Sequence, residues 1–396
     1  MCDHAPRMPL DRPQEMPSLG LPPDLIDPIA FVAQNGGYRE TDSLDVFPEV
    51  QPDNAEDYYN RAVLKAYKLR DVTGALADLD EAILLGRGSA NELNPQYANA
   101  YYHRAVLKQI KLDDVLGALS DYDRAIELNP QFVDAYYNRG ILKQTKLDDV
   151  SGALADYNRT IELNPKFADV YYSRAILEET KLDDIFGAFT DYNRAIKLSP
   201  QFADAYYRQA LLKVSINDVS GALTDYDKAI ELNPQDANAY HHRANLKQTR
   251  LNDVPGALTD YDKTIELNPQ DIDAYCNRAI LKQFRLNDVL GALADYDKAV
   301  EINPQYANAY YNRASLKTSK LNDVHGALID YHKAIEMNPQ YASAYEGRAV
   351  LKQAKFEDLH GSIQDLERAA TLYKQQGNVE DWQDIIDRLK ELENAI

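Results

Sequence analysis

The segment from Asp134 to Pro165 reads DAYYNRGILKQTKLDDVSGALADYNRTIELNP and carries the signals of two helices and two turns. Apolar and small residues recur at i, i+3, i+4 and i+7 in both halves, as they do in amphipathic helices. The Asp-Asp pair before the second half can accept the free amides at a helix N-terminus. Pro165 cannot continue a helix, and it biases the asparagine before it away from helical angles. The segment is therefore predicted to be a helical hairpin.

This pattern repeats along most of the 396 residues. The proline steps that close the units are spaced 35 residues apart, with one interval of 34, and such a period is typical of a solenoid. The closing Asn-Pro or Ser-Pro steps lie at Pro95, Pro130, Pro165, Pro200, Pro234, Pro269, Pro304 and Pro339. The units are predicted to begin near Ala55, Ala98, Val133, Ala168, Ala203, Ala237, Ile272, Ala307 and Ala342.

Tyr136, Gly140, Ala153, Tyr157 and Pro165 stand at the aromatic, small, small, aromatic and proline positions of the tetratricopeptide repeat (TPR), which the chain resembles. The resemblance implies an all-α solenoid, a right-handed superhelix of about nine helix-turn-helix hairpins. It covers residues 54–373 in nine repeats, at about 54–85, 97–130, 132–165, 167–200, 202–234, 236–269, 271–304, 306–339 and 341–373. The Tyr-Tyr-Asn-Arg and Gly-Ala-Leu-x-Asp-Tyr variant looks like the tandem TPR proteins common in cyanobacteria.

Most units are one residue longer than the usual TPR, and alignment places the extra residue in the turn between the two helices, as at Lys146-Leu147-Asp148. The unit with Ile216-Asn217 lacks it. A longer surface turn is tolerated because it shifts neither buried face. Small residues such as Ala105, Ala118 and Ala125 are expected where the paired helices approach closely.

The flanks differ from the repeats. Residues 1–53 hold nine of the 18 prolines and no repeat, so they are predicted to be mostly extended or disordered. The glycines of the insertion Gly86–Asn91 predict a flexible loop. Residues 378–396 are predicted to form a capping helix that covers the last apolar surface of the array. Its apolar face would consist of Trp382, Ile385, Ile386, Leu389 and Leu392.

Composition restricts the possible partners. The formal net charge is -20, which repels phosphate backbones and anionic lipid surfaces, so nucleic acid and membrane insertion are disfavoured and a neutral or basic protein is favoured. Only two cysteines are present, and the first residues lack the basic start and apolar run of a signal peptide. A cytoplasmic protein is expected.

The TPR resemblance implies a concave groove, lined by the first helix of each hairpin, that binds extended peptides or partner helices. Alignment places six tyrosines on this face, and tyrosine suits peptide recognition because it combines a large apolar ring with a hydroxyl group. Acidic and amide side chains flank them. The groove residues implied in this way are Tyr59, Tyr102, Tyr137, Tyr172, Tyr207, Tyr311, Asn138, Asn312, Asp134, Asp169 and Asp204. The alternative is that neighbouring tyrosines pack on one another.

Arginine recurs in eight of the nine first helices where the usual TPR has leucine, and aspartate recurs in each second helix. We expect Arg-Asp ion pairs inside most hairpins, because the guanidinium group can bind a carboxylate through two hydrogen bonds. The predicted structural pairs include Arg104 with Asp121, Arg139 with Asp156, and Arg313 with Asp330. The fifth unit has Gln209 opposite Asp225 and serves as a natural control. Arginines directed at an anionic ligand are the alternative reading.

The sequence indicates no enzyme and no cofactor, since neither a His-Glu-x-x-His motif nor a Gly-rich phosphate loop is present. His241 and Cys276 align in adjacent units, but repeat drift explains them better than metal binding does. The function expected is a non-catalytic scaffold for protein-protein interaction, with a possible role in complex assembly. The alternative is an RNA-binding helical repeat of the pentatricopeptide kind, which the acidity disfavours.

Overall fold

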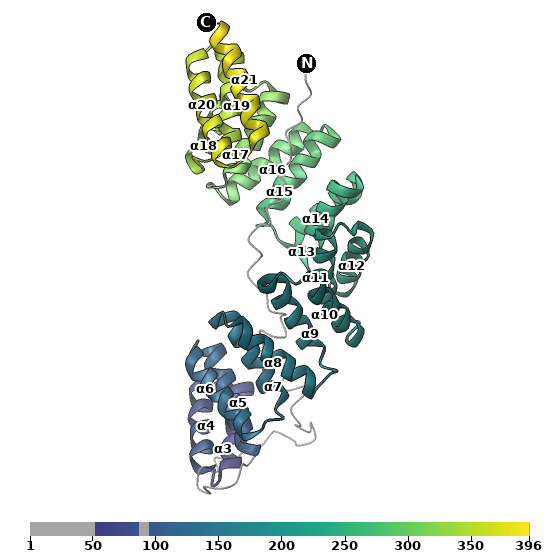
Figure 1. Ribbon diagram of the computed structural model, residues 1–396, viewed down its shortest axis with the longest axis vertical. Helices are drawn as coiled ribbons and strands as arrows, with labels where there is room; N and C mark the ends of the chain where they lie inside the picture. Colours follow the sequence, from purple (N-terminus) through teal and green to yellow (C-terminus); the bar gives the residue numbers. More distant parts are fainter. Residues whose placement is uncertain (1–51, 87–94, 396) are drawn as a thin grey trace. The chain divides into compact units, whose positions relative to one another are not determined.

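The computed structural model describes residues 52–86 and 95–395, and every regular element in these two ranges is a helix (Figure 1). Nineteen α-helices lie there, and eighteen of them form nine consecutive hairpins, numbered here from one to nine along the chain. The two helices of each hairpin pack on each other. The prediction of an all-helical array of paired hairpins is confirmed.

The chain divides into two compact units, with the boundary between Ala205 and Tyr206, inside helix α11. The first unit contains hairpins one to four, which are α3 (Ala55–Leu64) with α4 (Val72–Gly86), α5 (Pro95–Lys111) with α6 (Val115–Leu128), α7 (Val133–Leu142) with α8 (Val150–Leu163), and α9 (Ala168–Leu177) with α10 (Ile185–Leu198).

Hairpin five is α11 (Ala203–Ser215) with α12 (Val219–Leu232), and all of it from Tyr206 onward belongs to the second unit. The remaining hairpins of that unit are α13 (Ala237–Leu246) with α14 (Val254–Leu267), α15 (Ile272–Leu281) with α16 (Val289–Ile302), α17 (Ala307–Leu316) with α18 (Val324–Met337), and α19 (Ala342–Phe356) with α20 (Leu359–Gln375). Helix α21 (Val379–Ala395) follows.

Residues 1–51 and 87–94 lie outside the described residues. The predictions of a mostly extended or disordered N-terminal segment and of a flexible loop after Gly86 fall on these two stretches.

The extra residue of the long repeats is placed differently from the prediction. In six hairpins the first helix ends in a five-residue π-helical turn, so the insertion is wound into the helix end and does not lengthen the loop. In hairpin three, Asp148 follows this turn with a left-handed backbone (φ 51°), and its N–H bonds to the carbonyl oxygen of Lys143. The π-helical turns are η1 (Lys65–Leu69), η2 (Lys143–Leu147), η3 (Glu178–Leu182), η4 (Lys247–Leu251), η5 (Lys282–Leu286) and η6 (Lys317–Leu321). Helix α11, in the shorter repeat, ends without one, as do α5 and α19 in two of the long repeats.

The predicted aspartate caps are present at the second helices. In hairpin three, Asp149 Oδ1 accepts the N–H of Gly152 at 2.9 Å. A Cβ atom on residue 152 would lie 2.0 Å from Asp149 Oδ2, so this capping geometry requires glycine. The same Asp-Gly bond occurs at each of the other eight second helices. The recurring Gly-Ala-Leu glycines therefore belong to helix caps.

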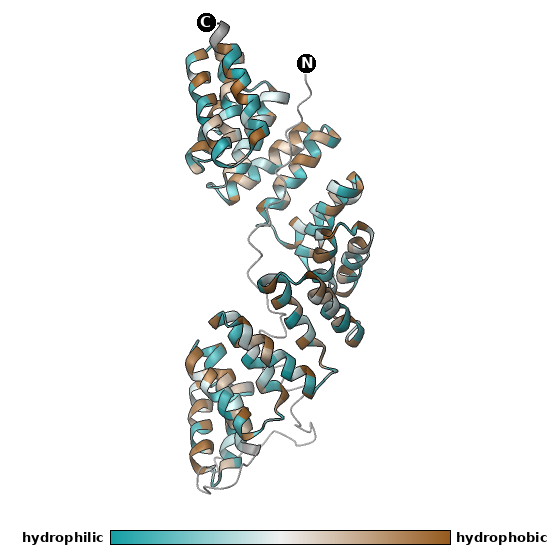
Figure 2. Ribbon diagram, in the orientation of Figure 1, coloured by the Kyte–Doolittle hydropathy of each residue, from teal (hydrophilic) through white to brown (hydrophobic). Residues whose placement is uncertain are grey.

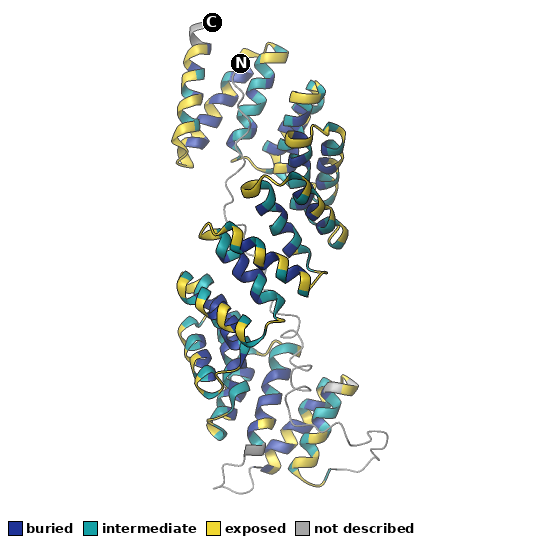
Figure 3. Ribbon diagram, turned by 90° about the vertical axis from the view of Figure 1, so that its right-hand side faces the viewer, coloured by how far each residue is buried: buried dark blue, intermediate teal, exposed yellow. Residues whose placement is uncertain are grey.

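The core of each hairpin combines small side chains with one large one. Apolar and polar residues share every helix (Figure 2), and the buried residues lie where paired helices meet (Figure 3). In hairpin two, Ala105, Ala118 and Ala125 are fully buried beside Tyr122, as expected for helices that approach closely. In the first and ninth hairpins Leu79 and Leu366 take the place of the second-helix tyrosine.

Helix α21 packs on α20 through one apolar face. Ile385, Leu389 and Leu392 are buried there, and Trp382 and Ile386 are partly buried in the same cluster. Removing these side chains from water stabilises the end of the second unit.

Candidate functional site

The tyrosines expected to line an open groove are largely buried in the first unit. Tyr102, Tyr137 and Tyr172 are exposed by only 3%, 2% and 2%. The ring of Tyr137 packs against Tyr157 of the same hairpin, with ring centres 6.2 Å apart, and against Phe167 at 4.8 Å. Tyr102 and Tyr172 make the equivalent contacts. The expectation that these rings present an accessible face is corrected, because they are core residues between successive hairpins.

The hydroxyl groups of these tyrosines join first helices to one another. Asn138 Nδ2 donates to the Tyr102 hydroxyl oxygen at 2.7 Å, and the Tyr137 hydroxyl lies 3.1 Å from Ser173 Oγ. Asn138 is itself buried, so its amide serves the fold and is not presented to a ligand backbone. Burial raises the pKa of Tyr137 well above its usual value, which keeps the hydroxyl group protonated.

Other first-helix side chains remain partly exposed. Tyr59 lies beside His103, with ring centres 5.6 Å apart, and burial raises the pKa of Tyr59 to about 12. In the second unit, Tyr311 is partly exposed next to Tyr341, and Asn312 is partly exposed beside it on α17. Tyr207 is buried, and its hydroxyl lies 3.3 Å from His242 Nδ1.

Acidic side chains begin several first helices. Asp134, Asp169 and Asp204 lie in the first turns of α7, α9 and α11, and all three are partly exposed. Burial raises the pKa of Asp134, whose side chain has no hydrogen-bond or ion-pair partner among the described residues. The charge of Asp169 contributes to the raised pKa of Tyr137, which places this carboxylate near the tyrosine row.

The predicted Arg-Asp pairs are brought together in the structure. Arg139 donates from Nε at 2.9 Å and from Nη2 at 2.6 Å to the two carboxylate oxygens of Asp156. Arg104 with Asp121 and Arg313 with Asp330 have the same two-bond geometry. Arg61, Arg174, Arg243, Arg278 and Arg348 bind Asp78, Asp191, Asp260, Asp295 and Asp365 in the same way.

Two partners of this network were missed by the sequence reasoning. The third guanidinium nitrogen, Arg139 Nη1, reaches back to Asp123 of the preceding hairpin at 2.6 Å. Lys143, one helical turn after Arg139, lies 2.8 Å from the second oxygen of Asp156. The recurrence of Lys four residues after Arg, and of an acid two residues after the paired aspartate, could have revealed both partners. Six of the arginines, Arg104, Arg139, Arg174, Arg243, Arg278 and Arg313, therefore hold neighbouring hairpins together, and each already has acceptors on two hairpins.

Hairpin four departs from this network at one position. Glu178 stands where eight hairpins have lysine, and its Oε1 lies 3.7 Å from Arg174 Nε. Its Oε2 is buried without a hydrogen-bond partner in the part of the chain that the structure describes. Burial, together with the nearby charge of Asp191, raises the pKa of Glu178 to about 7.

Hairpin five has Gln209 in place of arginine, and Lys213 lies 2.6 Å from Asp225. His241 and Cys276, aligned in adjacent hairpins, are both buried. His241 Nδ1 lies 3.0 Å from Asp271 Oδ2, and burial raises the pKa of the Cys276 thiol. Across residues 52–86 and 95–395, no three His, Cys, Asp or Glu side chains are grouped to hold a metal ion. Within those same ranges, no helix has the length and apolar character needed to cross a bilayer.

Comparison with known protein families identifies the repeat. The TPR repeat model matches residues 114–146, 210–250 and 284–317, and a second tetratricopeptide repeat model matches residues 307–341. The chain therefore contains TPR repeats in these segments. Comparison with curated protein sequences gives no match.

Several solved structures are similar. The C-terminal part of a TPR repeat-containing protein from Cytophaga hutchinsonii is 15% identical, covers 64% of this chain and 99% of its own, and has a TM-score of 0.51, which supports the fold. A tetratricopeptide repeat protein from Parabacteroides merdae is 23% identical, covers 65% of this chain and 99% of its own, and has a TM-score of 0.46.

YrrB, described as a TPR protein with an unusual peptide-binding site, is 24% identical, covers 48% of this chain and 97% of its own, and has a TM-score of 0.42. These similarities do not support the predicted cyanobacterial type.

Proposed function

We propose that the chain is a non-catalytic scaffold that binds a neutral or basic polypeptide on its first-helix face. This name denotes the partly exposed surface of the first helices, which in the first unit carries Asp134, Asp169 and Asp204. TPR repeats generally bind proteins or peptides. The same offset in successive hairpins gives a regular row of side chains, which suits an extended ligand that makes one contact per repeat.

The observation that carries the proposal is the state of Asp134. Its carboxylate is partly desolvated, has no cationic partner among the described residues, and has a raised pKa. By contrast, the buried carboxylate of Asp156, in the second helix of the same hairpin, is matched by Arg139 and Lys143. A lysine or arginine of a partner would lower the electrostatic cost of Asp134 and add a charge-assisted hydrogen bond.

The tyrosine row has a supporting role in this proposal. Since Tyr102, Tyr137 and Tyr172 are buried, they set the spacing between hairpins and so the spacing of the acidic row. The partly exposed Tyr59, Tyr311 and Asn312 remain candidates for direct contact with a ligand. The net charge of -20 favours a neutral or basic protein partner and disfavours nucleic acid. A role in the assembly of a complex fits a scaffold of this kind.

The test is affinity capture from the native cell with the full chain and two variants. The first variant combines Asp134→Asn, Asp169→Asn and Asp204→Asn. The matched control removes three exposed charges from second helices through Glu81→Gln, Glu127→Gln and Glu162→Gln. We expect that one protein is captured by the unchanged chain and by the control but is lost with the first variant. Its binding should weaken as salt is raised. If the affinity is the same at low and high salt, and the same for the first variant as for the unchanged chain, another surface is used.

A further inference from the structure

The turn of hairpin seven exposes three large apolar side chains. Phe284 and Leu286 in η5 are 45% and 44% exposed, and Leu290 in the first turn of α16 is 73% exposed. All three lie within seven residues of one another in sequence, around Arg285. A clustered apolar patch of this kind on a charged surface is typical of an interaction site.

The other hairpins show that the fold does not need these side chains. The position of Phe284 is occupied by Thr145, Thr180, Thr249 and Ser319 in four other hairpins, and the position of Leu290 by Ser151 and Ser220 in two others. The helices around those smaller, hydroxyl-bearing residues have the same bounds relative to the repeat. Phe284 and Leu290 therefore gain burial only when another molecule covers them.

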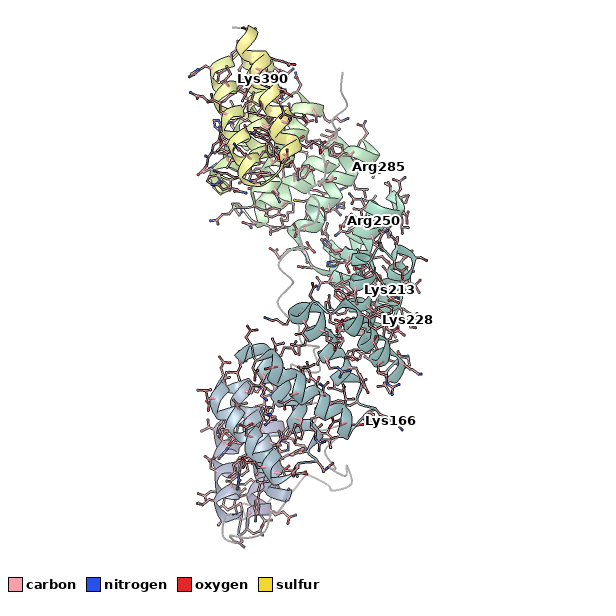
Figure 4. All side chains as sticks on the ribbon, in the orientation of Figure 1. Lys166, Lys213, Lys228, Arg250, Arg285 and Lys390 are labelled. Atoms are coloured by element: carbon pink, nitrogen blue, oxygen red, sulfur yellow. The ribbon has the colours of Figure 1, made fainter. Side chains whose placement is uncertain are left out.

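Two cationic side chains border the same turn, and each has a neutral asparagine side chain as its hydrogen-bond partner. Arg285 donates to the Asn252 side-chain oxygen, and Lys320 Nζ lies 3.4 Å from Asn287 Oδ1. The carboxylate of this turn, Asp288, is occupied as a helix cap by the N–H of Gly291 at 2.9 Å. Arg285 projects from the edge of the second unit in Figure 4, where Arg250 of the preceding turn also lies.

Two equivalent lysines of the first unit are neutralised. Lys146 lies 2.8 Å from Asp113, and Lys181 lies 2.7 Å from Asp148, so carboxylates stand there in place of asparagines. Hairpin four also exposes an apolar pair, Leu182 and Phe186, next to its neutralised Lys181. Hairpin two has a similar apolar pair, Leu112 and Leu116, beside the single cation Lys111. At hairpin seven, three exposed apolar side chains lie beside two cations, Arg285 and Lys320, whose hydrogen-bond partners are amide oxygens.

We propose that this turn patch, made of Phe284, Arg285, Leu286, Leu290 and Lys320, binds an acidic and apolar segment of a partner protein. Carboxylates of the segment pair with Arg285 and Lys320, and its leucine or phenylalanine side chains cover Leu286 and Leu290. The two cations of the turn patch are complementary in charge to an acidic segment. The remainder of the chain is acidic and repels such a segment, so charge directs the segment to this patch. This surface is separate from the first-helix face and requires a ligand of opposite charge.

The test is a selection of displayed random short peptides on the immobilised full chain, followed by affinity measurements on the selected peptides. Two variants address the turn patch, namely Arg285→Glu with Lys320→Glu, and Leu286→Ser with Leu290→Ser. The matched control changes the hairpin-four edge through Lys181→Glu with Phe186→Ser. Circular dichroism confirms that each variant is folded. Peptides that depend on Asp134 or Asp169 are assigned to the first-helix face and scored separately.

We expect selected peptides that combine Asp or Glu with Leu or Phe and that lose about tenfold in affinity with both turn-patch variants and not with the control. Their binding weakens as salt is raised. The proposal is overturned if no selected peptide responds to these variants, if the responding peptides are basic, or if the hairpin-four control has the same effect. Failure of the first-helix variant leaves this result unchanged, so the two surfaces are tested independently.

Discussion

Arg139 Nη1 and Asp123 Oδ1 are joined by a hydrogen bond of 2.6 Å, although one belongs to hairpin three and the other to hairpin two. The same arginine holds Asp156 with its other two nitrogens, so one guanidinium group joins three helices. Arg104, Arg243, Arg278 and Arg313 repeat this arrangement with Asp80, Asp227, Asp262 and Asp297. The arginine row is therefore a structural device that fixes both the helix pair and the step to the preceding hairpin.

The Arg139→Ala variant should destabilise the array by about 3 kcal/mol, because it leaves a buried carboxylate with only one cation. Asp156 is 4% exposed at its side chain, whereas Asp123 is 48% exposed. Asp123→Asn should therefore cost under about 1 kcal/mol. Denaturant unfolding analysed with a nearest-neighbour repeat model measures both values. Equal costs for the two variants would contradict the assignment of Asp156 as the main partner.

Glu178 should make hairpin four less stable as pH rises. Its pKa is raised from 4.5 to about 7 in the folded chain, so the folded state holds a proton that the unfolded state has lost. The stabilising contribution is complete below pH 4.5 and is lost as pH rises through about 7. The effect should be on the order of 1 kcal/mol, because the residue is incompletely buried.

Glu178→Lys restores the residue found in the other hairpins, and it should abolish this pH dependence. Hydrogen exchange of α9 and α10 between pH 5 and 8 measures the effect locally, and Glu179→Lys is the control at the adjacent position. If α9 and α10 of the unchanged chain show the same relative protection across this range, Glu178 is ionised throughout.

Two histidines, the buried His103 and the partly buried His242, should act in the opposite direction. Burial lowers the pKa of His103 and of His242 from 6.5 to about 4. The unfolded chain takes up these protons first, so stability is full above pH 6.5 and falls as pH is lowered toward 4. His103→Asn introduces the residue used by hairpin three at this position, Asn138, and should flatten the acid side of the stability profile. An unchanged profile would mean that His103 is already solvated in the native state.

The cap of α8 predicts a non-additive pair of substitutions. Gly152→Ala should cost about 1–2 kcal/mol, because the new Cβ atom displaces the Asp149 carboxylate from its bond to the amide of residue 152. In an Asp149→Ala background the same change should cost much less, since no carboxylate remains to be displaced. Thermal or denaturant unfolding of the four proteins of this cycle gives the coupling. Additive costs would exclude the steric explanation.

Tyr137 should be a residue of stability and not of ligand contact. Tyr137→Ala should destabilise the first unit by about 3–5 kcal/mol, because the ring fills the space between Tyr157 and Phe167. Tyr137→Phe removes only the bond to Ser173 and should cost about 1 kcal/mol. Partner binding measured with the Tyr137→Phe protein should be unchanged. A strong loss of binding without a loss of stability would restore the tyrosine to the ligand surface.

Much of the fold follows from local signals in the sequence. The caps at Asp149 and its equivalents, the closing proline steps and the apolar spacing place the helices, because each signal acts within one or two turns of chain. The ion pair between Arg139 and Asp156 could also be predicted from the sequence, because arginine and aspartate recur at fixed positions of the repeat. The reach of Arg139 to Asp123 was missed because it depends on the packing distance between hairpins.

The depth at which the tyrosine rings are buried could not be predicted from the sequence, for a related reason. Helical periodicity tells which face Tyr137 occupies, but the depth of the ring depends on Phe167 of the following hairpin. The π-helical turn at Lys143–Leu147 was missed because alignment counts residues and does not distinguish a longer loop from a widened helical turn. The candidate site therefore shifts from the tyrosine row to the acidic row beside it.

Hydrogen exchange of the full chain, free and bound to its captured partner, tests most directly whether the first-helix face is the binding surface. The account predicts slower exchange in α7 and α9 on binding, with α8 and α10 changed little. Protection confined to α8 and α10, or protection that persists after Asp134→Asn and Asp169→Asn, would contradict it.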